Sequence, residues 1–328
     1  MDIYLKKAIM HVIDREDGQP ILAENEMDLT VEYSRKYLIN KIRKLSSAKT
    51  KVGELLPNSE FAMQLKEIET GEFVTATKNL AELWYRVYSE SEEAPNADLI
   101  FVLYEMDTVL YLAMIKLNYK ENYTHKIDGS TNELIINRIG LPTGSPDEGI
   151  AINIKNLHYE LLEKKYYFSG SKLPYFSEKV IQSRPEASLD ERVSGIKKLI
   201  KKIGKKFDVD EYELMTLTNE AIYQGIEKEG VIDTDNIAEK VFSDNVSAQM
   251  QFKSEISQTD FSKMNKAVEG VQGIAEKKFS RQKFVLDNGI ELIIPIELYK
   301  NPDVVEFINN PDGTVGVNLK NVDNITAK

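Results

Sequence analysis

The sequence contains no cysteine, and this absence removes three classes of chemistry at once. A disulfide scaffold, a zinc site built on thiolates and a cysteine nucleophile all need this residue type. A chain without cysteine also fits a reducing compartment. The first residues, Met1–Lys7, lack the order of basic and then apolar residues that marks a signal peptide. We therefore expect a cytoplasmic protein.

Long apolar runs are also missing. The longest, Leu99–Tyr104 and Val109–Ile115, have the length of strands and are far too short to cross a bilayer. We therefore expect no membrane partner. The 328 residues are 42% hydrophobic and 29% charged, which is close to a globular average, so the chain can bury a core. This length suits two domains or one large one.

Positive charge is in the minority. The chain has 42 lysines and arginines against 53 acids, and its formal net charge is −11. Such a protein is on average repelled by nucleic acid and by anionic lipid. Any partner of this kind would need a local basic surface, so the distribution of charge matters more than its sum.

Recognisable motifs of catalysis are absent as well. The sequence has no phosphate-binding loop, no dinucleotide fingerprint and no nucleophile elbow. The histidines His11, His125 and His158 lie far apart along the chain. The acidic clusters Glu90–Glu93 and Asp233–Asp235 are typical of a solvated face and a helix cap. We predict no catalytic residue, no metal site and no cofactor, and thus a protein that is not an enzyme.

Residues 1–183 have the pattern of an α+β domain built on an antiparallel sheet. A hairpin is expected over Ala8–Ala23, and a strand pair over Asp98–Tyr104 and Val109–Leu117. Further strands are expected at Glu133–Ile139 and Gly149–Ile154. Helical spacing of apolar residues predicts packed helices around residues 31–45 and 78–88.

Residues 184–278 are predicted to be mainly helical, and residues 279–328 to be rich in β-structure. Helices are expected over Ser188–Phe207, which carries strong capping signals, and over Asp210–Lys228. In the C-terminal region, Asn288-Gly289 and Asn309–Gly313 predict the turns of two hairpins. The expected fold is thus an antiparallel sheet with packed helices, a central helical segment and a β-rich C-terminal part.

Two stretches stand out because each holds seven cations and no acid. The first consists of Arg35, Lys36, Lys41, Arg43, Lys44, Lys49 and Lys51. The second consists of Arg192, Lys197, Lys198, Lys201, Lys202, Lys205 and Lys206. Without these fourteen residues the chain would have 28 cations and 53 acids, a net charge of −25. We call the two stretches the first and the second basic patch.

The second basic patch lies on a helix with two distinct sides. Apolar residues form a seam at spacings of three and four, namely Val193, Ile196, Ile200, Ile203 and Phe207. Lysine pairs recur every four residues and line up along the opposite side of the helix, so like charges repel one another there. A row of phosphates would relieve this repulsion. The alternative without a bound polyanion is a solvated helix face whose seam packs on the core. Binding to an anionic membrane is disfavoured because the seam is narrow and contains no tryptophan.

The sequence resembles the bacterial 37-kDa nucleoid-associated proteins. The similarity is visible in Ala8–Arg15, Leu45–Lys49, Asp98–Tyr104 and Tyr175-Phe176, and the mass of 37.4 kDa agrees with it. The resemblance implies a nucleoid location and DNA binding with little sequence preference, and it provides no catalytic residues. It also suggests partners in chromosome maintenance, with a type II topoisomerase as one candidate.

The residues and the resemblance together predict non-specific contact with duplex DNA phosphates through both basic patches. Two other functions stay open. An acidic interaction module could act on a DNA-processing enzyme, with incidental lysines. A metal-dependent hydrolase could assemble from scattered carboxylates. The sequence does not determine the oligomeric state.

Overall fold

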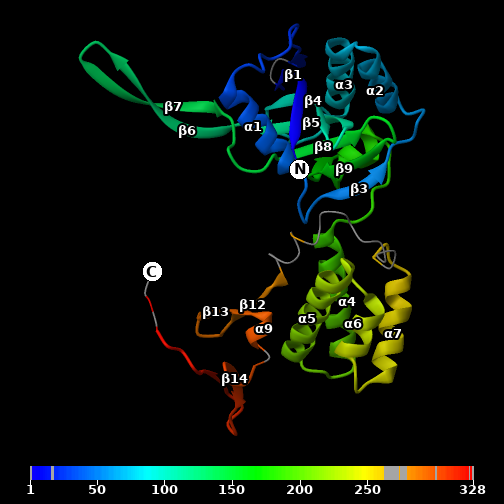
Figure 1. Cartoon of the computed structure of the whole chain (residues 1–328), viewed down its shortest axis with the longest axis vertical. Coiled ribbons are helices and arrows are strands. Elements are labelled where there is room, and N and C mark those ends of the chain that lie inside the picture. The colour runs from blue at the N-terminus through cyan, green and yellow to red at the C-terminus, as the bar shows by residue number, and fades with distance from the viewer. Residues whose placement is uncertain are drawn as a thin grey trace. The chain divides into compact units, whose positions relative to one another are not determined.

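The computed structural model describes residues 2–15, 18–261, 273, 279–299, 301–324 and 326. The chain divides into two units, Met1–Leu189 and Asp190–Lys328. Helices and antiparallel strands occur in both units, which confirms the predicted α+β class (Figure 1).

The first unit is built on an antiparallel sheet of seven strands. The sheet contains β1 (Ile3–Asp14), β2 (Gln19–Ile21), β3 (Lys51–Glu54), β4 (Ala97–Met106), β5 (Val109–Asn118), β8 (Glu148–Asn153) and β9 (His158–Leu162), in the order β2-β1-β4-β5-β8-β9-β3. The predicted pair β4–β5 is confirmed. It is joined at Asp107 and Thr108, which both have positive φ, as the tight turn of a twisted hairpin requires.

Helices cover both faces of this sheet. On one face lie α2 (Glu60–Thr70) and α3 (Phe73–Tyr88), and on the other lies α1 (Glu32–Arg43). In β4, Leu99 and Phe101 belong to the buried cluster under α2 and α3, whereas Ile100 and Val102 belong to the cluster under α1. Side chains alternate between the two faces of a strand, and helices cover both faces of β4. All of these positions are therefore buried and apolar. This burial explains the continuous apolar run in its sequence.

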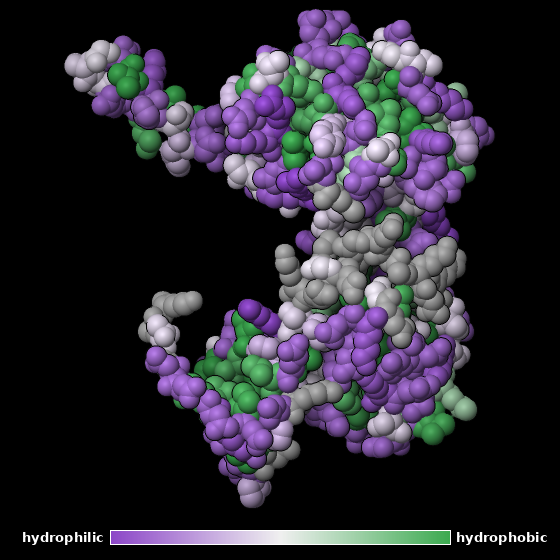
Figure 2. All heavy atoms as spheres, in the orientation of Figure 1, coloured by the Kyte–Doolittle hydropathy of each residue, from purple (hydrophilic) through white to green (hydrophobic). Residues whose placement is uncertain are grey.

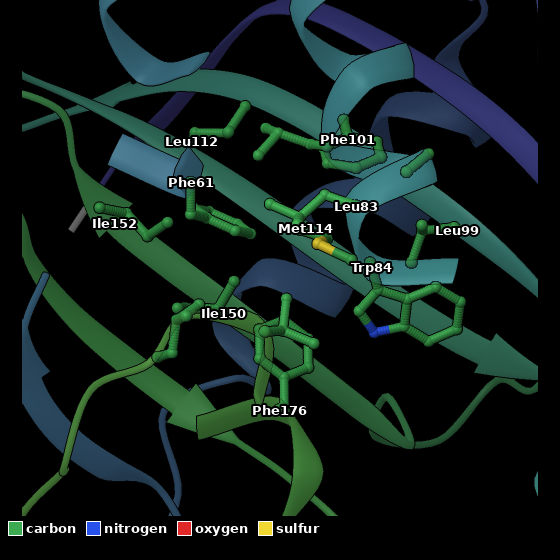
Figure 3. Close-up of a cluster of buried hydrophobic side chains, with 14 of the residues drawn as sticks. Phe61, Leu83, Trp84, Leu99, Phe101, Leu112, Met114, Ile150, Ile152 and Phe176 are labelled. Carbon is green, nitrogen blue, oxygen red and sulfur yellow. The ribbon is translucent and has the colours of Figure 1, made fainter. Parts of the chain in front are cut away.

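The larger of these two clusters contains the only tryptophan of the chain (Figure 3). The Trp84 ring stacks on Tyr88 with centroids 4.1 Å apart, and its Nε1 donates a hydrogen bond to the Tyr175 hydroxyl at 3.1 Å. Around it, side chains from the helices and from the strands point towards one another, including Phe101 and Met114. The indole is therefore both buried and hydrogen-bonded, as buried tryptophans usually are.

One glycine in the sheet allows α1 to pack closely. A Cβ on Gly149 would lie 2.6 Å from a methyl carbon of Leu45 and 2.9 Å from the backbone oxygen of Met114. The backbone oxygen cannot move without disturbing β5. We expect Gly149→Ala to lower the free energy of unfolding by about 1–3 kcal/mol, the range for overpacked cores. Denaturant unfolding followed by Trp84 fluorescence measures this, and an unchanged midpoint would contradict the expected clash.

A hairpin of two long strands extends from the sheet. It consists of β6 (Lys120–Asp128) and β7 (Thr131–Gly140), which among the described strands pair only with each other. The hairpin projects away from the rest of the first unit (Figure 1). We call it the β6–β7 arm. The unit ends with the short strands β10 (Tyr166–Phe168) and β11 (Ser171–Leu173) and a π-helical turn at Phe176–Val180.

The second unit begins with helices and ends with hairpins. Its helices are α4 (Leu189–Lys206), α5 (Glu211–Glu229), α6 (Thr234–Val241), α7 (Val246–Ser257) and α9 (Ile296–Tyr299), and its strands are β12 (Arg281–Val285), β13 (Glu291–Pro295), β14 (Val305–Asn309) and β15 (Val315–Leu319). Asp233 caps α6, since its carboxylate accepts the backbone N–H groups of Asp235 and Asn236. The predicted helices up to residue 257 and both predicted C-terminal hairpins are thus present. The end of the predicted helical segment, residues 262–272 and 274–278, lies outside the described residues.

Aromatic contacts fasten the C-terminal hairpins to α5. Phe284 of β12 and Phe307 of β14 pack with centroids 5.3 Å apart. Tyr212 of α5 contacts both rings, and its hydroxyl lies 3.0 Å from that of Tyr299. These hairpins therefore form their small core (Phe284, Ile294 and Val305) against a helix rather than alone.

Candidate nucleic-acid interface

The first basic patch begins on α1, which packs on the sheet through Leu38, Ile42 and the following Leu45. Lys41 lies on this packed side and is buried. Its ammonium donates hydrogen bonds to the carbonyl oxygens of Pro142 and Gly144. Burial, with a smaller contribution from the Lys44 charge, lowers the pKa of Lys41 to about 8. Lys41 therefore fastens the loop after β7 to the helix and offers no exposed charge.

Three further cations of the first basic patch are engaged within the protein. Arg35 donates to the carbonyl oxygens of Leu29 and Thr30 at 2.7 and 2.8 Å. Lys36 forms an exposed ion pair with Glu32, one helical turn away. Lys51 pairs with the buried carboxylate of Glu163 at 3.1 Å. The carboxylates of Glu32 and Glu163 thus compensate the charges of Lys36 and Lys51, and the Arg35 guanidinium interacts electrostatically with the Asp28 carboxylate.

The remaining cations of this patch surround the end of α1. Arg43 and Lys49 are exposed, and neither side chain makes a hydrogen bond or ion pair with another of the residues that the structure describes. Lys44 is half-buried and donates to the carbonyl oxygen of Thr143 at 3.2 Å, which leaves its charge uncompensated. Thus Arg43, Lys44 and Lys49 are the members best placed to meet an anion.

The second basic patch lies on α4, whose predicted seam is buried. Ile196, Ile200 and Ile203 have no exposed surface. Gly204 allows α5 to approach the helix closely, because a Cβ there would overlap a methyl carbon of Leu214. Packing of this seam directs the lysines outwards. Arg192 is the exception, since it is buried beside the seam.

Acids from other helices compensate part of the lysine row. The ammonium of Lys201 pairs with Glu211 at the start of α5, and that of Lys202 lies 2.7 Å from a carboxylate oxygen of Glu255 on α7. Lys206 donates to the Gln251 side chain at 2.7 Å. The expected repulsion along α4 is therefore relieved inside the protein for two of its members, which weakens the sequence argument for a bound polyanion.

Lys198 and Lys205 remain as the uncompensated members of the row. Both are exposed, and within the described residues neither side chain forms a hydrogen bond or ion pair. They are seven positions apart, so they lie on one side of α4 and are separated by about 10.5 Å along its axis. Lys197, beside them, is half-buried. Together Lys198 and Lys205 give α4 a persistent positive side.

The buried positions of Lys41 and Arg192 have a signal in the sequence. Lys41 is three residues after Leu38 and directly before Ile42, and Arg192 is three residues after Leu189 and directly before Val193. Each cation thus takes the i+3 position of an apolar stripe whose other members face the core. A count of cations along the chain does not show that a cation at this position is buried.

The described residues give no support for a metal site or for a membrane-spanning helix. Among the described residues, no three or more histidines and acids gather closely enough to hold a metal ion. Over the same part of the chain, no helix has both the length and the apolar composition needed to cross a bilayer. His11 is buried in the sheet, whereas His125 and His158 are exposed.

Comparison with known proteins gives one family match, and it spans nearly the whole chain. No curated protein matches the sequence. The model of the family described as nucleoid-associated protein YejK matches residues 9–326. That interval includes both basic patches and most of both structural units. The chain therefore belongs to the YejK family of nucleoid-associated proteins.

Proposed function

We propose that this protein binds duplex DNA through the phosphate backbone, without sequence preference, as part of a cytoplasmic nucleoid. Exposed and uncompensated cations carry the proposal: Arg43 and Lys49 in the first unit, with Lys44 beside them, and Lys198 and Lys205 in the second. In a chain of net charge −11, these cations are local exceptions to a repulsive surface. Membership of a nucleoid-associated family also supports DNA binding.

The arrangement suits phosphates better than bases. The cations project from a helix side and from a loop end, and the proposed contact set contains no aromatic side chain on which a base could stack. Lys41 and Arg192 do not enter this set because they are buried. The other members of the two patches would contribute only if DNA displaced their protein partners.

The test is a salt titration of duplex binding with two unrelated DNA sequences and nuclease-free protein. We expect the same affinity for both sequences and a steep linear fall of log K with log salt concentration, because each phosphate contact releases counterions. Unequal affinities would indicate base readout. Absence of binding at low salt would contradict the proposal and favour a protein partner.

Replacing the named lysines by glutamate tests whether they contact DNA. We expect Lys198→Glu with Lys205→Glu to reduce the salt slope by about 2, since each phosphate contact contributes about 0.9. The matched control is Lys155→Glu with Lys165→Glu, two exposed lysines outside both patches. Both double variants change the net charge equally. If the control lowers affinity as much as the α4 variant, net charge rather than local contact controls binding.

The same design applies to the first unit, with Arg43→Glu and Lys49→Glu against the same control.

A type II topoisomerase partner stays a prediction from the resemblance, because no contact among the described residues bears on it. We also leave the carboxylate hydrolase aside, since no observation on the described residues favours it.

A further inference from the structure

The outer side of α1 carries an aromatic ring in line with cations. Four residues follow one another at spacings of three, four and three, so they share one side of the helix: Tyr33, Lys36, Asn40 and Arg43. All four are exposed, because the opposite side of the helix packs on the sheet. Figure 2 shows hydrophilic side chains on the surface where α1 lies. We call these four residues the α1 stripe.

Tyr33 takes no part in the packing of α1. It is 79% exposed, and its side chain makes no ring contact, cation–π contact or hydrogen bond with any of the residues that the structure describes. Tyr37, one turn later, is by contrast half-buried, and its hydroxyl donates to the carbonyl oxygen of Pro142 at 2.9 Å. A single exposed apolar surface is ordinary on a protein, so the meaning of Tyr33 depends on its neighbours.

Those neighbours form a positive surface. The segment 28–49 contains six cations and two acids, a net charge of +4 in a chain of −11. Both acids are engaged, since Glu32 pairs with Lys36 at 2.6 Å and the Asp28 carboxylate accepts hydrogen bonds within its own turn. Arg43 and Lys49 are exposed and form no ion pair within the described part of the chain. The Tyr33 ring thus lies on the same helix side as an uncompensated cation.

An exposed ring beside uncompensated cations matches single-stranded DNA. Proteins bind such strands by holding the phosphates with cations and by stacking unpaired bases on aromatic side chains. In a duplex the bases already stack on one another, so the ring adds nothing to the duplex contact. Tyr33 and Arg43 are ten positions apart, or about 15 Å along the helix axis, which about four stacked nucleotides span.

We propose that the α1 stripe binds single-stranded DNA, with an unpaired base stacked on the Tyr33 ring and phosphates of the same strand held by Arg43 and Lys49. This inference rests on the proposed function, because it takes over the phosphate contacts of the first basic patch and adds a base contact to them. Stacking accepts every base, so the site stays without sequence preference while it distinguishes unpaired from paired DNA.

Fluorescence anisotropy of the full chain with two labelled strands tests the base contact. One strand is a short oligothymidine, and the other is an abasic strand of the same length, so both carry the same phosphates. We expect the wild type to bind the oligothymidine about 5- to 150-fold more tightly, the range for one base–aromatic stack. Tyr33→Ala should remove this difference. Tyr33→Phe should keep it, because the ring rather than the hydroxyl makes the contact.

The matched control is Tyr123→Ala, which removes a tyrosine of the β6–β7 arm that is 71% exposed. It should prefer the oligothymidine as the wild type does. None of these variants changes the charge of the chain. The fall of log K with log salt concentration should therefore have the same slope in all of them, about 0.7 for each phosphate contact of a single strand. A smaller slope in Tyr33→Ala would mean lost phosphate contacts and would contradict the stack.

Four further results would overturn the inference: equal affinity of the wild type for both strands, a Tyr33→Ala variant that keeps the preference, a Tyr33→Phe variant that loses it, and a Tyr123→Ala variant that loses it. The Tyr33→Phe result would assign the hydroxyl to a phosphate, and the Tyr123→Ala result would move the stack to the arm.

Duplex binding separates this inference from the proposed function. We expect Tyr33→Ala to bind duplex DNA as tightly as the wild type does. If the wild type binds duplex DNA but shows no preference for oligothymidine over the abasic strand, only the base contact is refuted. If it binds neither duplex nor single strand at low salt, the proposed function fails as well.

Discussion

Replacement of Glu148 by alanine is expected to lower the free energy of unfolding by about 3–5 kcal/mol, the range for removing one partner of a buried ion pair. The carboxylate of Glu148 lies 2.7 Å from the Lys116 ammonium in the sheet. Both side chains have at most 1% of their surface exposed. The Tyr166 hydroxyl lies 2.9 Å from the same ammonium. Without Glu148, the Lys116 ammonium would lose the carboxylate that it contacts, while burial still opposes its charge.

The measurement is denaturant unfolding followed by tryptophan fluorescence. Trp84 is the only tryptophan and lies in the first unit with the ion pair, so its signal reports that unit. The matched control is Glu105→Ala, which removes the exposed pair with Lys6 at 2.9 Å. We expect the control to lose less than about 1 kcal/mol.

A double variant separates buried charge from packing. Lys116→Met with Glu148→Leu removes both charges and keeps similar volumes, so we expect it to recover most of the stability that Glu148→Ala loses. If Glu148→Ala loses no more than the exposed control, the ammonium has found water or another acid, and the pair does not stabilise the sheet as described.

Mild acid is expected to destabilise the first unit through His11. This side chain is buried, and its Nδ1 accepts the backbone N–H of Ala23 at 3.1 Å. Burial, with a smaller effect of the Lys78 charge, lowers the pKa of His11 from 6.5 to about 4. The unfolded chain therefore binds a proton below pH 6.5, whereas the folded chain does so only near pH 4. The stabilisation is complete above pH 6.5 and is lost as the pH falls through this window.

The size of this effect follows from the pKa difference. Each pH unit inside the window contributes about 1.4 kcal/mol, so the loss reaches about 3 kcal/mol by about pH 4. We would measure unfolding by Trp84 fluorescence at about pH 7 and about pH 5 in the wild type and in His11→Gln, on either side of the upper limit of the window. Glutamine can accept the Ala23 N–H and does not titrate, so its pH dependence should be shallower. His125→Gln, at an exposed position, should behave as the wild type does. Equal slopes for His11→Gln and the wild type would contradict this assignment.

Much of the fold could be predicted because local signals agreed with it. The β4–β5 pair, the predicted α3 region and the capped helices α4 to α6 all appear where their apolar spacing and end residues indicate. The helix α2 was missed although Ser59 caps it and Gly71 ends it with positive φ. Strand β6 was missed for a physical reason. It is exposed throughout and its polar residues outnumber the apolar ones, so its sequence alternates only weakly.

The candidate site was less predictable because its electrostatics depend on distant residues. Glu255 is 53 positions from its partner Lys202, and Glu163 is 112 positions from Lys51. A short segment of sequence around each patch does not contain these acids. Both basic patches were therefore interpreted as free of negative charge. Burial of Lys41, by contrast, could have been read from its position within an apolar stripe. The division into three regions at residues 183 and 278 stays a prediction.

The strand order of the sheet has a consequence for folding during synthesis. Strand β1 pairs with β4, so Ile9 meets its partner Phe101 across about 90 positions of chain. At elongation rates of about 5–20 residues per second, the ribosome needs roughly 5–20 seconds to make that partner. Over this interval Ile9 and Ile13, which are fully buried in the finished sheet, have no β4 against which to pair. During this interval the nascent β1 strand exposes apolar side chains that a chaperone would protect.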